Sequence, residues 1–246
     1  GFYTAGGRFR KLIGVSLLLA AFQSAWALDV MKGDFQQVLN TRSEVLAVWQ
    51  MADNPSVYIF DFPGLGFQGR SFNRITQFTE QQTTEAYPKV LGNQELARYI
   101  EAARRTSADF AFGHDVLISE LVQFYNFALR DKIELNPEEI AIREFLVEQG
   151  LIRLWRGFYQ AMQPDVVVLA VPQTQDRKPG EPMVSTGARY AILLHELAHG
   201  EYYSNKHYAK FCQRFWPETL TDNQRDSLKR FLVNLNYPAN NQELPT

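Results

Sequence analysis

The chain has 246 residues, of which 46% are hydrophobic and 13% aromatic, too apolar a composition for an intrinsically disordered protein. Its 25 basic and 27 acidic residues leave a net charge of −2. They form no basic stripe, so we expect no nucleic-acid partner. The length fits a single domain. The lone cysteine, Cys212, has no partner for an intrachain disulfide, and we expect it to be a buried apolar residue.

The first 27 residues have the pattern of a secretory signal peptide. Three basic residues between positions 8 and 11 precede an apolar run over 12–22, and the small-x-small sequence Ala-Trp-Ala ends at Ala27. The apolar run is too short to cross a bilayer comfortably. We therefore expect cleavage after Ala27 and export to a bacterial periplasm or outside the cell. We expect no stable membrane insertion of the mature chain.

The first half of the chain combines helical periodicity with one clear strand. Apolar residues at three-to-four spacing predict a helix over 34–52, and VYIFDF (57–62) is typical of a buried strand. Further helices are predicted after Asn93, over 115–131 and after Asn136, where the two asparagines act as N-caps.

The second half adds another strand and two helices. DVVVLAVP (165–172) predicts a strand, and a loop rich in proline and glycine leads to a helix that begins near Thr186. Thr221 and Gln224 form a capping box for the last helix. About eight helices and two to four short strands predict a mainly helical α+β fold. Residues 28–246 are expected to form one domain. Because the sequence begins with Gly rather than Met and stops soon after a helix, this domain is consistent with a C-terminally truncated fragment.

One glycine-rich stretch has the spacing of a nucleotide-binding motif. Gly64-x-Gly66-x-x-Gly69 follows the predicted strand 57–62 with the spacing of a dinucleotide-binding turn. Pro63 in the tight turn and a weak following strand count against that interpretation. We expect the glycines to redirect the chain and expect no nucleotide cofactor.

The strongest motif is His195-Glu196-Leu197-Ala198-His199, an H-E-x-x-H sequence within an apolar helix. Positions i and i+4 lie on one face of a helix, so His195 and His199 can bind one Zn²⁺ ion. Glu196 points about 100° around the helix, where it can take a proton from a zinc-activated water and later pass it to a leaving amine. The alternative is a purely structural helix whose histidines make ordinary hydrogen bonds and bind no metal.

Four further residues have candidate roles at the site. Gly200 is expected to end or bend the helix near the metal. His114 is either a structural histidine or a substrate-binding or oxyanion-stabilising group. Tyr202 and Tyr203 are expected to pack beneath the metal helix, with donation to an oxyanion as the alternative.

The third zinc ligand is not apparent from the motif. Glu218 follows His199 by 19 residues, and this spacing resembles the aminopeptidase branch of the gluzincin metallopeptidases. However, Glu218 follows Pro217 rather than lying inside an uninterrupted helix. His207 is the other candidate, although an ordinary surface or capping role fits its position better.

A wider resemblance spans about 180 residues. GARYAILLHELAHGEYYSN, FDFPGLGFQGRSFNRI and FGHDVLISELVQFYN resemble an uncharacterised group of exported bacterial proteins with an H-E-L-[AS]-H-G-E core. That group implies a zincin-like domain whose chain continues past a stretch like YPANNQEL into a helix bearing a glutamate. The resemblance therefore implies that the third ligand lies beyond Thr246, and it implies no particular substrate.

These observations predict an exported zinc metallohydrolase, most simply a peptidase acting on peptides or proteins, with His195 and His199 as ligands and Glu196 as general base. The strand DVVVLAVP is expected to line the cleft and pair with extended substrate. The competing class is a non-enzymatic periplasmic or secreted binding protein with a structural or degenerate metal site. Hydrolysis of a non-peptide amide is a further alternative. The oligomeric state stays open.

Overall fold

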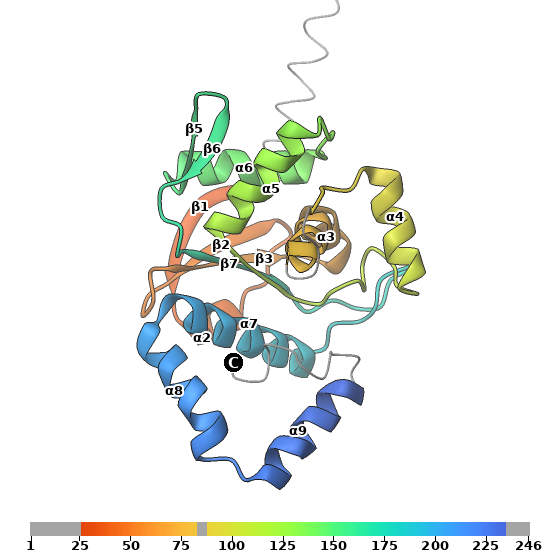
Figure 1. Cartoon of the computed structure of the whole chain (residues 1–246). Coiled ribbons are helices and arrows are strands. Elements are labelled where there is room, and N and C mark those ends of the chain that lie inside the picture. Colours follow the sequence, from red (N-terminus) through yellow and green to blue (C-terminus); the bar gives the residue numbers. More distant parts are fainter. Residues whose placement is uncertain (1–25, 83–87, 235–246) are drawn as a thin grey trace, which may run out of the picture.

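The computed structural model describes residues 26–82 and 88–234 (Figure 1). Positions 1–25, which hold most of the predicted signal peptide, lie outside the described residues. The first described element is a strand that begins at Trp26, and it includes the expected cleavage position after Ala27.

A five-stranded mixed sheet forms the centre of the molecule, in the order β1-β2-β3-β7-β4. β1 and β2 are parallel, as are β3 and β7, whereas the β2–β3 and β4–β7 pairs are antiparallel. Every residue of β3 and β7 is buried, because helices cover both faces of these two inner strands. The strands are β1 (Trp26–Gly33), β2 (Leu46–Met51), β3 (Val57–Phe62), β4 (His114–Leu117) and β7 (Val167–Pro172).

Two helical layers sandwich this sheet, and each has its own core. The larger core lies beneath the layer that contains α3, α5 and α6, and the smaller one lies beneath α2 and α7 (Figure 1). The helices of the larger layer are α3 (Leu65–Gln82), α5 (Ile118–Arg130) and α6 (Pro137–Glu148), with α4 (Asn93–Ala102) beside α3. The helices of the smaller layer are α2 (Phe35–Leu39) and α7 (Thr186–Ser204).

A hairpin and a pair of helices project from opposite sides of this sandwich (Figure 1). The hairpin of β5 (Ile152–Trp155) and β6 (Phe158–Ala161) packs on α5 and α6. On the other side, α8 (Lys206–Glu218) follows α7, and α9 (Asp222–Asn234) has no buried residue (Figure 1). Cys212 is buried in α8, as expected for an apolar residue.

The coarse α+β class is confirmed, but the sequence underestimates the strands. The helix predicted over 34–52 is wrong beyond Leu39, since residues 46–51 form β2 between β1 and β3. The apolar spacing of this segment fits a helix, but its Leu-Ala-Val-Trp sequence also suits a buried strand. Pairing with β1 and β3 therefore determines that it forms a strand. The predicted helix 115–131 likewise begins as strand β4 and becomes helical only at Ile118.

The predicted caps are mostly confirmed. Asn136 caps α6 through the backbone N–H of Glu139, and the capping box of Thr221 and Gln224 opens α9. Asn93 is one residue out of place, because Gly92 occupies the N-cap of α4. The Asn93 side chain instead accepts a hydrogen bond from Arg74.

Each helical layer contains a fully buried arginine–carboxylate pair. Arg74 of α3 lies 2.9 Å from Glu139 of α6, and Arg189 of α7 lies 2.6 Å from Asp61 of β3. Burial raises the pKa of Glu139 to about 7 and that of Asp61 to about 6, while the partner arginine lowers each pKa. A water-excluded ion pair therefore joins α3 to α6 in the larger layer, and another joins α7 of the smaller layer to the sheet.

Candidate metal site on helix α7

Helix α7 carries the H-E-x-x-H residues, and its ends are set by local signals. Ser185 caps its start by accepting a hydrogen bond from the Ala188 N–H at 3.1 Å, and Asn205 follows its last residue. The helix continues through Gly200 to Ser204, so the prediction that Gly200 ends it is wrong. A Cβ at Gly200 would lie 3.2 Å from Val57 and 3.3 Å from Leu169. Glycine at this position therefore allows α7 to approach β3 and β7 closely.

Arg189 fixes α7 to the sheet less than two turns before the first histidine. Its guanidinium donates to both carboxylate oxygens of Asp61, at 2.6 and 2.8 Å, and to the carbonyls of Pro172 and Val38 at 2.9 and 2.7 Å. These partners belong to β3, β7 and α2. Such a fork of charge-assisted hydrogen bonds leaves α7 little freedom to rotate or slide.

His195 and His199 converge on one point beside this helix. Their Nε2 atoms lie 3.1 Å apart and their ring planes meet at 84°. Two nitrogens on a tetrahedral zinc lie about 3.3 Å apart, given zinc–nitrogen distances of about 2.05 Å. A hydrogen bond between the rings also has this length, so metal content distinguishes the two arrangements. His199 is buried whereas His195 is exposed, which leaves the point accessible from one side.

Glu196 is buried next to the loop that enters β4. A Cβ built on Gly113 would lie only 2.1 Å from the Glu196 Oε1 atom, so the carboxylate occupies the space of a missing side chain. The neighbouring carbonyl of Phe112 accepts a hydrogen bond from Gln68 of α3 at 3.1 Å, which fixes this loop. The sequence contained no signal for Gly113, because its role depends on packing between segments 83 residues apart.

Helix α7 packs on both β7 and β4, but only β4 has an edge without a neighbouring strand among the described residues. The prediction that DVVVLAVP pairs with substrate is wrong, because β7 uses both edges for β3 and β4. β4 lies at the end of the sheet and runs antiparallel to β7. Among the described strands, β4 is therefore the one that presents an edge beside α7.

Aromatic and polar contacts hold the C-terminal half of α7. Tyr203 stacks on His199 with a ring separation of 6.4 Å, and Tyr202 lies edge-on to Tyr203. The Glu201 carboxylate accepts hydrogen bonds from Asn54 at 2.7 Å and from Asn205 at 3.2 Å. The two tyrosines thus contact α7 residues, but Tyr203 is 43% exposed, and packing beneath the helix stays a prediction. Glu201 has a partner in the β2–β3 turn.

His114 lies on the opposite face of the sheet from the motif. It stacks on Phe72 of α3, and its Nδ1 atom makes a hydrogen bond with Thr76. Complete burial lowers the pKa of His114 to about 3, so the ring is neutral at ordinary pH. These contacts describe a structural histidine.

The structure does not bring a third predicted ligand to the two histidines. Glu218 is exposed at the end of α8 and lies 3.6 Å from Arg214, and His207 is exposed in the first turn of α8. Across residues 26–82 and 88–234, no three His, Cys, Asp or Glu side chains gather closely enough to hold a metal. Neither Glu218 nor His207 therefore completes the site.

The three glycines with nucleotide-motif spacing pack closely against other segments of the chain. A Cβ at Gly66 would lie 2.4 Å from a carboxylate oxygen of Glu181, and one at Gly64 would lie 2.9 Å from Gln175. A Cβ at Gly69 would lie 2.2 Å from the Ser107 carbonyl. The start of α3 thus receives the 175–181 loop, and close packing explains the three glycines.

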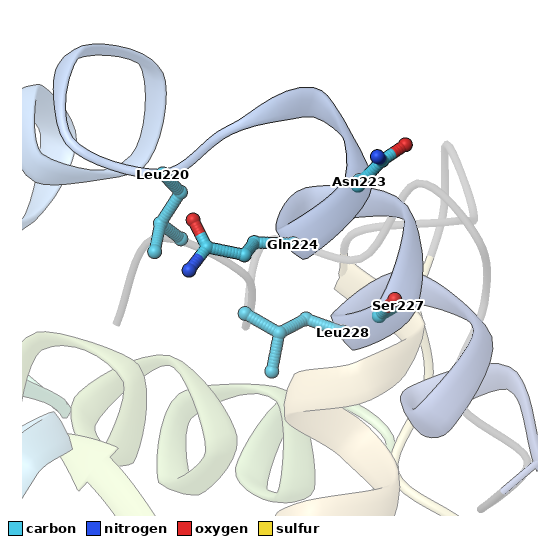
Figure 2. A pocket seen from close by; sticks show the side chains of 5 residues that line it. All are labelled: Leu220, Asn223, Gln224, Ser227 and Leu228. Carbon is cyan, nitrogen blue, oxygen red and sulfur yellow. The ribbon is translucent and has the colours of Figure 1, made fainter.

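A hollow of about 400 Å³ lies at the start of α9, away from the motif (Figure 2). Leu220, Gln224 and Leu228 point into the same space, whereas Asn223 points away. Its lining is mostly apolar and includes no motif residue, so this hollow does not add to the candidate metal site.

No protein-family model matches this chain, and neither a curated protein nor a solved structure does. None of the helices in the described ranges combines the length and the apolar character that a bilayer-spanning helix needs.

Proposed function

We propose that the protein is an exported zinc-dependent metallohydrolase with a zincin-like domain, and that its substrates are peptides or proteins. The observation that carries the proposal is the 3.1 Å separation of the His195 and His199 Nε2 atoms on one face of α7. The spacing suits two ligands of a tetrahedral zinc. Glu196 follows the first of them and lies buried against Gly113.

Within this proposal each residue has one task. His195 and His199 hold the metal, which in such sites makes water nucleophilic near neutral pH and polarises the substrate carbonyl. Glu196 takes the proton of the attacking water and delivers it to the leaving amine as the carbon–nitrogen bond breaks. Arg189 keeps α7 in place through Asp61 so that the three side chains stay aligned.

The sheet edge supports a peptide substrate. β4 lies beside α7 and is an edge strand among the described strands, and extended peptides bind such edges by adding a strand. Gly113 at the start of this edge adjoins Glu196, so a peptide paired with β4 would have its backbone near the general base.

The remaining ligand has to be sought outside the described ranges. There the sequence contains two further residues of a metal-binding type, Glu85 and Glu243. Glu243 belongs to the YPANNQEL stretch and is the first residue to test, followed by residues beyond Thr246.

Metal content and proteolysis of denatured casein test the proposal. We expect about one zinc per chain in wild type, loss of zinc in His195→Ala, and retained zinc in Glu196→Gln. The Glu196→Gln variant should lose roughly 10²–10⁴-fold in kcat, because proton transfer is removed while the metal stays.

Three results would each contradict a part of the proposal. Wild type that binds no zinc after reconstitution, both as these 246 residues and with any residues that follow Thr246 in its gene, excludes the metal site. Wild type that binds zinc but hydrolyses nothing favours the binding-protein alternative. Activity unchanged in Glu196→Gln excludes the assigned base. Glu218→Gln serves as a control of the same chemistry, and zinc loss in Glu243→Gln identifies the third ligand.

A further inference from the structure

The tip of the β5–β6 hairpin exposes large apolar side chains. Leu154 is 57% exposed, Trp155 49% and Phe158 60%. Two arginines, Arg153 and Arg156, accompany them, and residues 149–164 contain no acidic residue. The hairpin tip therefore combines apolar surface with positive charge.

The turn places one of these charges at an unfavourable backbone position. Arg156 and Gly157 form the two-residue turn and both have positive φ, of 51° and 84°. Hairpin turns of this kind prefer Asn, Asp or Gly at the first position, because larger L-residues adopt positive φ only at some cost. The turn therefore places the Arg156 side chain at the tip in spite of this conformational cost.

The strand register places the aromatic residues and one arginine on a common face. Trp155 pairs with Phe158, and Arg153 pairs with Gln160 two residues further from the turn. Side chains of directly opposed residues share a face of the hairpin. The guanidinium groups of Arg153 and Arg156 lie 5.3 and 5.6 Å from the Trp155 ring, so both cations flank one indole.

The hairpin is anchored to α5 directly behind the exposed Phe158, through Tyr159. Asn126 of α5 accepts a hydrogen bond from the Tyr159 N–H at 2.7 Å and donates one to its carbonyl at 2.9 Å. Tyr159 also packs against Tyr125 with a ring separation of 5.9 Å. The tip is thus presented outward by a fixed base.

We propose that the β5–β6 hairpin docks the protein on an anionic phospholipid bilayer. Tryptophan beside arginine suits the boundary between headgroups and acyl chains, where the indole is buried while the cations reach anionic headgroups. This inference is independent of zinc and of hydrolysis.

The position of the hairpin leaves the metal helix free. β5 and β6 lie on the side of α5 and α6, whereas α7 covers the opposite face of the sheet (Figure 1). Docking through the hairpin would therefore hold His195 and Glu196 on the side that faces away from the lipid surface.

Sedimentation with vesicles tests this docking. The full chain is mixed with vesicles of phosphatidylcholine containing about 30% phosphatidylserine, or of phosphatidylcholine alone, at low and high salt. We expect binding to the anionic vesicles that weakens at high salt. The double variant Trp155→Ala/Phe158→Ala should bind at least about tenfold more weakly, and Arg153→Gln/Arg156→Gln should bind about tenfold more weakly.

The matched control is Phe211→Ala/Phe231→Ala, which removes two aromatic side chains that are 60% and 59% exposed on α8 and α9. The N-terminal apolar run is common to all variants, so differences among them report on the hairpin. Quenching by brominated lipid gives a local readout: Trp155→Phe should still bind but lose most of the quenching seen in wild type.

The proposal is overturned if wild type does not bind anionic vesicles, if the hairpin variants bind like wild type, or if the Phe211/Phe231 control loses binding equally. Quenching that stays unchanged in Trp155→Phe would also overturn it, because another tryptophan would then be the one in lipid. Thermal unfolding of each variant verifies that the fold is kept.

Discussion

The two faces of the central sheet use buried histidine in different ways. On the α3 face, His114 is enclosed by Phe72 and Thr76, and burial lowers its pKa to about 3. On the α7 face, His199 is also buried, but its Nε2 atom points to that of the exposed His195. Burial alone therefore does not mark a functional histidine. Convergence of two ring nitrogens on a point with access to solvent is the better indicator.

The two buried ion pairs extend the same contrast. Arg74–Glu139 joins two helices of the larger layer, whereas Arg189–Asp61 joins α7 to the sheet. Both pairs contribute to the fold, but only the second acts on the alignment of the candidate site.

The largest expected effects come from breaking each buried ion pair, and zinc binding should distinguish the two pairs. Asp61→Asn and Glu139→Gln should each lower the free energy of unfolding by about 3–5 kcal/mol, because each leaves an arginine buried without its counter-charge. Only Asp61→Asn should also weaken zinc binding, since Arg189 then holds α7 less firmly. Denaturant unfolding and zinc titration at a temperature where both variants are folded measure the two effects. Equal loss of zinc affinity in both variants would contradict a positioning role for Arg189.

The pH dependence of stability tests the structural histidine. An unfolded His114 binds a proton near pH 6.5 but the folded one only near pH 3, so the unfolded state binds more protons between these values. Stability should therefore fall on acidification, by about 3 kcal/mol from this group between pH 7 and pH 4. Urea unfolding of wild type and His114→Gln at both pH values measures the difference. The same pH dependence in the variant would show that another group causes it.

Substitution of Gly113 on the α7 face and of Gly69 on the α3 face should affect catalytic activity differently. Gly113→Ala should lower kcat roughly 10–100-fold by displacing the Glu196 carboxylate. Gly69→Ala introduces an equally close contact, 2.2 Å from the Ser107 carbonyl, but on the α3 face. It should destabilise the fold without a specific loss of kcat. Casein hydrolysis per folded molecule gives the readout, and a similar loss of kcat in both variants would count against the proposed packing of Glu196.

The smallest effect is expected for Glu218→Gln. Its ion pair with Arg214 is exposed on both sides, and such pairs contribute at most about 1 kcal/mol. Zinc content should be unchanged and the free energy of unfolding should shift by less than about 0.5 kcal/mol. A clear loss of zinc would restore Glu218 as a ligand.

Local signals predicted much of the fold but not the sheet. The strands at 57–62 and 165–172, the Asn136 cap and the Thr221–Gln224 capping box depend on neighbouring residues, and the structure contains all of them. Strands β2 and β4 were predicted as helix, because apolar spacing in short segments does not distinguish a helix from a buried strand.

The sequence by itself determined that His195 and His199 face the same side of one helix, because they are at positions i and i+4. It also placed Glu196 about 100° around that helix. Only the tertiary structure decided that Gly113 receives the Glu196 carboxylate, that Arg189 ties the helix to Asp61, and that β4 rather than β7 forms the edge. These features join segments that are far apart along the chain. They depend on long-range packing and strand pairing, which local spacing does not encode.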